Sequence, residues 1–429
     1  MLGGRNGTRV RRIALAVWVL AALLGGRLAV QTWRASGEPA HGFVTHWVAS
    51  RLVLRGEPIA RFYDDVWFNA RVDEVEPGVS DIFGANPPTV ALAVTPVAWL
   101  DYAPARRVVA LGSLLIWLGA AVWLGRVLAL PAAWAGLLVC LATMFQPAIE
   151  GLRHAQLHIP VFALLLVAWR SWRNGTRADS AIVETHARTA QSWTRALSTG
   201  VPLGAALALK AAGGVLWLLL LAQRRWRSLL AGGAVVTVLV LITLALSGVS
   251  AWTAFRDRAN VLRASGSLTV TAYQSLPGMV RRLTSPDTRW NPAPLLDAPV
   301  AGSLIAGLLV LALVAMSMMV AARRPPVDAL FAAFAALAVA VSPVSLDYHY
   351  VICLLPIAVL LARLRAEAWR TQGVLLLGAV LLIGADLPYR SPRLADGWLV
   401  VLAYPKLCGA LLLWALAMHD ARRRPVPAR

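Results

Sequence analysis

Apolar residues along this chain are gathered into long runs, and short polar, basic or Pro/Gly-rich breaks separate the runs. Each run holds about 14–25 residues, close to the roughly 20 residues with which a helix crosses a bilayer core. The pattern therefore predicts helices over 13–30, 87–100, 105–125, 131–147, 157–170, 198–210, 212–223, 228–247, 298–322, 326–342, 348–364, 371–387 and 397–418.

The composition supports a membrane location for these helices. Of 429 residues, 59% are apolar and 14% are charged, and the mean hydropathy is +0.65. A soluble chain of this length needs more charge to cover its surface. We therefore expect an all-α polytopic membrane protein that forms a single membrane domain over residues 1–429.

The first run, Ile13–Val30, follows a basic tail and has two interpretations. It is either a signal peptide or an uncleaved first membrane helix. The length of the run, and the lack of an A-x-A-like site after it, favour the membrane helix.

The net charge of +20 is spread over the breaks between the runs. This is typical of cytoplasmic loops under the positive-inside rule and of lipid headgroup contact, so we expect no nucleic-acid partner. The predicted location is a bacterial plasma membrane, with both termini and a basic loop over 171–197 in the cytoplasm. One path through about twelve crossings fits, provided that 87–100 does not cross and that 198–223 forms a hairpin of two half-length helices. The hairpin turns near Lys210 to Gly214, and such broken backbone at membrane depth indicates a site.

This path places two long segments outside, 31–86 and 248–297. The first carries eight acidic residues, and its stretch Phe43–Leu54 has the pattern of a helix lying on the membrane surface. A transporter site normally lies among its helices at the bilayer midplane. A long acidic outer loop and the lack of an inverted repeat favour an enzyme, and a transporter or flippase stays the alternative.

Candidate phosphate ligands are a lysine and a histidine. Lys210 lies in ALALKAAGG, where a cation at membrane depth costs about 2.5–3.5 kcal/mol and usually faces a partner or a cavity. The alternative is a lysine that snorkels at a helix end. His349 and Asp347 lie in SPVSLDYHY; the imidazole can bind phosphate or move a proton, or both are polar residues of a helix end.

Further polar residues are candidates for sugar or acceptor contacts. Gln156 and His158 lie in GLRHAQLHIP, where His154 and His158 share a helix face. Such a pair can bind metal, but no cysteine or acid lies on that face, so we expect no metal. Sugar contact and structural polarity remain open. Gln274, in TAYQSLPG, either faces the same cavity or caps a turn.

The outer loop holds the candidate catalytic bases, because glycosyl transfer needs a group that takes the acceptor proton. They are His41, His46, Asp64, Asp65 and Asp81, and most charges on such a loop are simply solvated. No Walker loop, GxGxxG or DxD-like motif is present, which argues against a nucleotide-sugar donor. Three cysteines, Cys140, Cys353 and Cys408, are expected to be packing residues.

Several short motifs occur in an order that resembles a known family. They are GFVTHWVASRLVLRGEPIARFYDD, NPPTVALAVTPVAWLDYAPAR, Ala155-Gln156-Leu157-His158, Leu209-Lys210-Ala211, Tyr273-Gln274-Ser275-Leu276 and Ser345-Leu346-Asp347-Tyr348-His349. Over roughly 13–365 the chain resembles the family 87 glycosyltransferases, the polyprenol-phosphate-mannose-dependent mannosyltransferase type with a GT-C bundle.

The resemblance implies a hexosyltransferase that needs neither a metal nor a cofactor. Its donor would be a polyprenyl-phosphate sugar and its acceptor a glycolipid or glycan of the cell envelope, with membrane lipids around it. Lys210 and His349 would hold the leaving phosphate. The resemblance implies an aspartate as the catalytic base at the position where this chain has Gly42. The candidates for that role are, in order of preference, His41, Asp64 and Asp81. The alternative is that the chain is an inactive scaffold.

Overall fold

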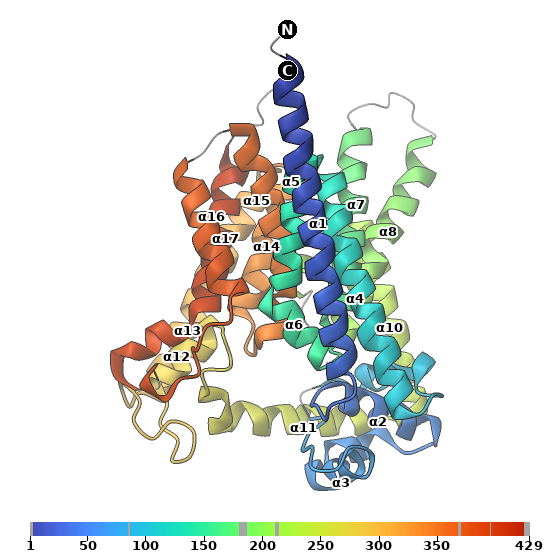
Figure 1. Cartoon of the computed structure of the whole chain (residues 1–429). Coiled ribbons are helices and arrows are strands. Elements are labelled where there is room, and N and C mark those ends of the chain that lie inside the picture. Colours follow the sequence, from blue (N-terminus) through green and yellow to red (C-terminus); the bar gives the residue numbers. More distant parts are fainter. Residues whose placement is uncertain are drawn as a thin grey trace.

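The computed structural model describes residues 3–84, 86–179, 187–210, 214–367, 370–394 and 396–423. These residues form helices and connecting segments, and their only bridge between extended residues joins Asp287 and Asn291. A bundle of long helices stands on a smaller unit of short helices, and the two chain ends lie at the far end of the bundle (Figure 1). The prediction of an all-α protein is confirmed.

Five helical stretches in the described residues are long and apolar enough to cross a membrane, and seven if two bent pairs are included. The bent pairs are α5–α6 (Ala132–Met144 and Gln146–Arg153) and η8–α17 (Gly397–Ala403 and Pro405–Arg422). The five are α1 (Gly3–Ala35), α4 (Tyr102–Val127), α10 (Trp226–Ser247), α13 (Pro299–Ala322) and Asp347–Leu364, in which η6 (Asp347–Cys353) leads into α15 (Leu354–Glu367). About twelve crossings are not confirmed.

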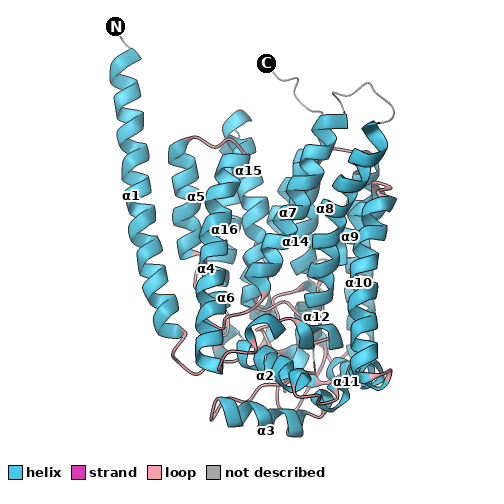
Figure 2. Cartoon of the chain, turned by 90° about the vertical axis from the view of Figure 1, so that its right-hand side faces the viewer, coloured by secondary structure: helices cyan, strands magenta, loops and turns pink. Residues whose placement is uncertain are grey.

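Shorter or less apolar helices complete the bundle (Figure 2). The most deeply buried is α14, whose residues Ala329–Ala340 are all inaccessible. Seven of these twelve positions are alanine, and small side chains let neighbouring helices approach closely where lipid supplies no hydrophobic drive. Besides α14 (Val327–Val341), these helices are α7 (His158–Asp179), α8 (Ala187–Leu209), α9 (Gly214–Ala222) and α16 (Arg370–Gly384).

Helices α8 and α10 are packed almost backbone to backbone. A Cβ atom added at Gly200 would lie 2.2 Å from the carbonyl oxygen of Ser228, and one at Gly204 would lie 2.5 Å from that of Gly232. Both pairs follow the small-x-x-x-small spacing that lets membrane helices cross closely. This crossing fixes the path of α8, which ends next to Lys210.

The chain turns back after α8 as predicted, but α8 has 23 residues, so only α9, with nine, is one of the two predicted half-length helices. Helix α8 ends at Leu209 and α9 begins at Gly214, while residues 211–213, on which the predicted turn falls, lie outside the described residues. The indole of Trp217 in α9 donates a hydrogen bond to the carbonyl oxygen of Leu203 in α8, at 3.4 Å. A straight continuation would place residues 14 apart about 21 Å from each other, so α9 turns back along α8.

A second hydrophobic core lies outside the bundle. Short helices over residues 43–98, together with α11 (Ser250–Ala264), form a compact unit that we call the cap. Its aromatic centre contains Phe62, Phe68 and Phe83, with ring centroids less than 6 Å apart. Its elements are α2 (Phe43–Leu54), η1 (Ile59–Tyr63), α3 (Asp65–Val75), η2 (Pro88–Leu92), η3 (Thr95–Val97) and α11.

The sequence made two predictions for this region, one for the segment 87–100 and one for helix α2. The segment 87–100 forms the two short turns η2 and η3 rather than a helix long enough to cross. Helix α2 has the predicted bounds, but nine of its twelve residues are buried, on all its sides. The helix therefore has no single buried face, because η1, α3 and η2 pack around α2, and its place at the membrane surface stays a prediction.

A buried arginine joins the cap to the bundle. Arg106 of α4 is 2% exposed and forms an ion pair with Glu76 of the cap, Nη1 to Oε1 3.3 Å. Its guanidinium also donates to the carbonyl oxygens of Ala35, Glu38 and Arg153. One side chain thus ties together the end of α1, the cap and α6.

This contact gives a first prediction. Replacing Arg106 by methionine leaves the Glu76 carboxylate buried without its cation, so we expect a loss of about 3–5 kcal/mol in the free energy of unfolding. The neighbouring Arg107 is exposed and stacks on Trp33, 5.0 Å from the ring centroid. Arg107→Met should cost only about 0.5–1 kcal/mol. Thermal unfolding in detergent, followed by tryptophan fluorescence, measures both; equal shifts would contradict the role of Arg106.

The second outer segment, 248–297, is also structured. It contains α11, the short turn η5 (Gly266–Thr269) and α12 (Leu276–Thr284), and α11 packs on η1 of the cap. Figure 2 shows α2, α3, α11 and α12 together at one end of the bundle. The predicted loop over 171–197 is shorter than expected, because α7 continues to Asp179 and α8 begins at Ala187; residues 180–186 lie outside the described residues.

Candidate functional site

Lys210 lies where the bundle meets the cap. Its backbone N–H continues the hydrogen bonding of α8 by donating to Ala206, so the ammonium group lies at the negative end of the helix dipole. Nζ donates to Oδ1 of Asn86 at 3.0 Å, and Thr89 donates to the carbonyl oxygen of Ala208 at 2.6 Å. No described carboxylate lies within ion-pair distance of Lys210.

Three imidazoles surround this ammonium. Lys210 interacts electrostatically with His46 of α2, His158 of α7 and His349 of η6. The rings of His158 and His349 are 4.2 Å apart between centroids, and the ring of Tyr348 lies 4.9 Å from each. The structure therefore brings together Lys210 and His349, the two predicted phosphate ligands.

The tautomer of His349 follows from its one hydrogen bond. Its Nδ1 accepts from the backbone N–H of Leu346 at 3.0 Å. A neutral imidazole that accepts at Nδ1 carries its proton on Nε2. His349 is then a donor at Nε2, the property that a contact to a phosphate oxygen requires.

Several polar atoms of this site lack protein partners. Both ring nitrogens of His46 and of His158 make no hydrogen bond to any residue that the structure describes, and each residue is 2% exposed. Gln156 lies beside His46, but without a hydrogen bond of normal geometry, and its Oε1 is also unpaired. An unpaired buried polar group costs about 1–3 kcal/mol. Several such groups around one cation indicate a place for a polar ligand.

His46 is neutral in this environment. Burial, with the Lys210 ammonium nearby, holds the pKa of the His46 imidazole well below its usual value. Lys210 is thus the cation of the cluster, and His46 can contribute one N–H donor and one acceptor.

Asp81 approaches the same site from the cap. Its Oδ2 accepts from the backbone N–H of Gly42 at 2.8 Å, and its own N–H donates to Asn69 at 2.9 Å. Asp81 interacts electrostatically with Lys210 and Tyr348. A carboxylate from a distant part of the cap is therefore held against position 42.

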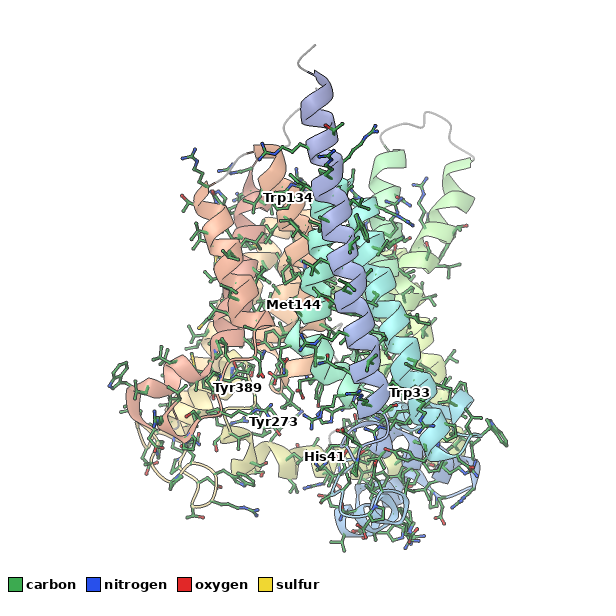
Figure 3. All side chains as sticks on the ribbon, viewed as in Figure 1. Trp33, His41, Trp134, Met144, Tyr273 and Tyr389 are labelled. Atoms are coloured by element: carbon green, nitrogen blue, oxygen red, sulfur yellow. The ribbon has the colours of Figure 1, made fainter. Side chains whose placement is uncertain are left out.

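The other two predicted bases, Asp64 and His41, are both exposed. Asp64 is exposed and caps α3, where its Oδ1 accepts from the N–H groups of Val66 and Trp67, both at 3.1 Å. His41 is exposed and precedes Gly42 directly. Figure 3 shows His41 between the end of the bundle and the cap, on the side where Tyr273 also lies. The geometry favours Asp81 and His41 over Asp64.

Two predicted sugar contacts already have protein partners. Gln274 is fully buried, with its amide nitrogen donating to Thr271 and Ala403 and its Oε1 accepting from Lys406. The carboxylate of Asp347 accepts from Tyr389 at 2.7 Å and from Arg390 at 3.2 Å, with the Lys406 ammonium 3.6 Å away. These contacts suit a structural role, in which Asp347 and Gln274 hold the segment that carries His349.

Sequence reasoning did not select two residues of the cluster. Asn86 binds the Lys210 ammonium, and the ring of Tyr348 stacks on His349 and also contacts His158. Asn86 begins the motif NPPTVALAVTPVAWLDYAPAR, which carries part of the family resemblance but does not by itself single out the asparagine. Tyr348 stands within the motif that selected His349, and an aromatic residue there does not by itself point to a ligand.

The fold and this cluster define a polytopic membrane protein with a cationic, imidazole-rich site at one end of its helices. The model of glycosyltransferase family 87 matches residues 85–345, more than half of the chain, and the chain belongs to this family. No curated protein and no solved structure matches it. The matched part includes Gln156, His158, Lys210 and Gln274. It begins after Asp81 and ends before His349.

Proposed function

We propose that this membrane glycosyltransferase moves a hexose from a polyprenyl-phosphate carrier to a glycolipid or glycan acceptor. One observation carries the proposal: among the described residues, Lys210 has no carboxylate within ion-pair distance and lies among imidazoles with unpaired nitrogens, where the helices meet the cap. A phosphate at the interface would supply the missing negative charge. Mannose as the sugar and a GT-C bundle are parts of the proposal that rest on the resemblance.

The reaction assigns a role to each group. The acceptor hydroxyl attacks the anomeric carbon, the bond from that carbon to the phosphate oxygen breaks, and its electron pair remains on the phosphate. Lys210 and the Nε2–H of His349 hold the developing charge, because preorganised donors are most effective where charge develops. The acceptor proton passes to a base in the cap. His46, Gln156 and His158 are placed to hydrogen-bond hydroxyl groups. The residues require neither a metal nor a cofactor for these steps.

The orientation in the membrane follows from the charges. Arginines stand at helix ends that lie away from the cap: Arg126 at the end of α4, Arg225 and Arg227 at the start of α10, Arg323 after α13 and Arg363 in the second half of α15. By the positive-inside rule we assign this end to the cytoplasm. The cap, and with it the transfer site, would then lie on the outer face of a bacterial plasma membrane, where a lipid carrier presents its sugar.

A second prediction tests which residue is the catalytic base. We expect Asp81→Asn to lower the transfer rate by about 10²–10⁴-fold, the usual contribution of a general base. Asp64→Asn keeps the helix cap, because asparagine caps as well as aspartate, and should leave the rate close to that of the wild type. Initial rates of sugar transfer in detergent measure both. Loss of transfer in His41→Ala with normal rates in Asp81→Asn would assign the base to His41 instead.

The proposal as a whole is tested with purified protein, a radiolabelled polyprenyl-phosphate hexose and a mixture of cell-envelope glycolipids. We expect label to appear in a glycolipid product in the presence of a chelator. Transport of the intact donor across proteoliposomes, without a labelled product, would favour a flippase. Neither product nor transport would favour an inactive scaffold.

A further inference from the structure

A second polar site lies at the opposite end of the bundle. A cavity of about 360 Å³ lies between α4, α7 and α8, close to where α7 ends and α8 begins (Figure 1). Ligand pockets usually measure about 300–1,000 Å³, so this cavity can hold a small headgroup. None of its residues belongs to the transfer site at the cap.

The cavity is positively charged. Arg170 and Arg195 line it, and none of its described lining residues is acidic. Arg195 donates to the carbonyl oxygen of Gly175 at 3.4 Å, while Arg170 makes no hydrogen bond or ion pair with the part of the chain that the structure describes. Asp328 of α14, which packs on α7, is paired with Arg173, Nε to Oδ2 3.1 Å. The guanidinium group of Arg170 can therefore bind an anion, and Arg195 adds positive charge beside it.

Hydroxyl groups lie beside these arginines. The Oγ atoms of Ser171 and Ser198 are 2.5 Å apart, and Thr199 donates to Ser171 at 3.1 Å. Guanidinium groups bind phosphate oxygens with charge-assisted hydrogen bonds, and hydroxyl groups can add further donors. Ser171 and Ser198 also donate to the backbone carbonyl oxygens of Thr194 and Arg195, so the guanidinium group of Arg170 is the main phosphate donor of this wall.

The remaining lining residues are Asn174, which is polar, and two apolar residues. Trp123 and Val167 complete the cavity, and Val167 is half-exposed on the surface of the bundle. Trp193, on the first part of α8, is also exposed. A ligand in the cavity would therefore have its charged group between the helices and an apolar remainder against the bundle surface. This is the arrangement of a membrane lipid.

We propose that this cavity binds the phosphate headgroup of an anionic membrane lipid. Basic pockets between membrane helices on the cytoplasmic side bind such headgroups in other proteins. The proposal does not depend on the transfer reaction. Lipid binding would still affect the transfer reaction, because Arg195 and Ser198 lie on α8 and Lys210 follows the other end of the same helix. A bound lipid that clamps α7 to α8 would also fix the position of Lys210.

The experiment is lipid titration of the full-length protein, with resolved binding of single lipids by native mass spectrometry. We expect phosphatidylglycerol to bind more tightly than phosphatidylcholine. Arg170→Gln and Arg195→Gln should each weaken phosphatidylglycerol binding by about fivefold, from about 1 kcal/mol per basic residue. Arg323→Gln removes an exposed arginine elsewhere and serves as the matched control, with unchanged binding.

A second variant fills the cavity without removing charge. Ser198→Trp should also weaken phosphatidylglycerol binding, and both arginines remain in place. Competition by inorganic phosphate shows whether the phosphate group alone is recognised; persistence of the lipid in its presence shows that the acyl chains contribute as well. Equal affinity for the two lipids, or unchanged phosphatidylglycerol binding in the arginine variants and in Ser198→Trp, would overturn the proposal.

Discussion

Replacing Lys210 by alanine should lower the rate of sugar transfer by at least about a hundredfold, the typical cost of removing one preorganised donor from a developing oxyanion. The reason is the position of the ammonium group. It is fixed by Asn86 at 3.0 Å, interacts with His158 and His349, and has no described carboxylate within ion-pair distance. Its removal leaves the leaving phosphate without a cation. Initial rates at saturating donor separate this effect from a change in donor binding.

Two control variants define the result. Lys210→Arg keeps the charge but changes its geometry, so we expect an intermediate rate. Arg263→Ala removes an exposed cation from α11 of the cap and should leave the rate unchanged. Thermal unfolding of each variant shows whether the fold is retained. A normally folded Lys210→Ala protein with wild-type transfer would end the assignment of Lys210 as a phosphate ligand.

The sequence predicted the helical class and the hairpin because both depend on local pattern. Runs of apolar residues define membrane helices one by one, and the break at Lys210 is visible as a polar residue within such a run. The number of crossings is different. It depends on whether short helices such as α14 and α16 span the bilayer, which length and apolarity alone do not decide.

The cap was the part that the pattern described least well. Phe43–Leu54 has the spacing of a surface helix, yet residues far away in sequence bury it on all sides. The pairing of Asp81 with Gly42 spans 39 residues, and that of Arg106 with Ala35 spans 71. Contacts of this separation leave no periodic signal. Three candidate bases therefore looked alike in the sequence, and only the fold distinguishes the capping role of Asp64 from the position of Asp81.

The substitution Gly42→Ala should destabilise the protein more than any other small change in the cap. Gly42 has φ +99° and ψ −76°, a conformation that side chains rarely adopt. A Cβ atom there would lie 2.1 Å from Nε2 of Gln156 and 3.2 Å from the carbonyl oxygen of His154. Backbone strain costs about 1–3 kcal/mol and overpacking about 1–3 kcal/mol more. The expected loss in the free energy of unfolding is about 2–6 kcal/mol.

Gly56 provides a matched control in the same unit. It also has a positive φ, +81°, but a Cβ atom there would meet nothing within 4 Å. Gly56→Ala should therefore cost the backbone strain alone, about 1–3 kcal/mol. Thermal unfolding of the two variants in the same detergent gives the difference. Equal destabilisation would show that the Gln156 side chain can move aside and that the close contact at Gly42 adds nothing to the cost of the substitution.

The same contact bears on catalysis, because Gly42 carries the N–H that holds Asp81 and its neighbour Gln156 lies beside His46. Gly42→Ala should therefore slow transfer even at temperatures where it remains folded, whereas Gly56→Ala should not. An aspartate at position 42 would meet the same side chain and carbonyl group, so Gly42→Asp should not restore transfer to Asp81→Asn. Restored transfer in that double variant would show that position 42 accepts a side chain after all. It would also show that the two carboxylates are interchangeable.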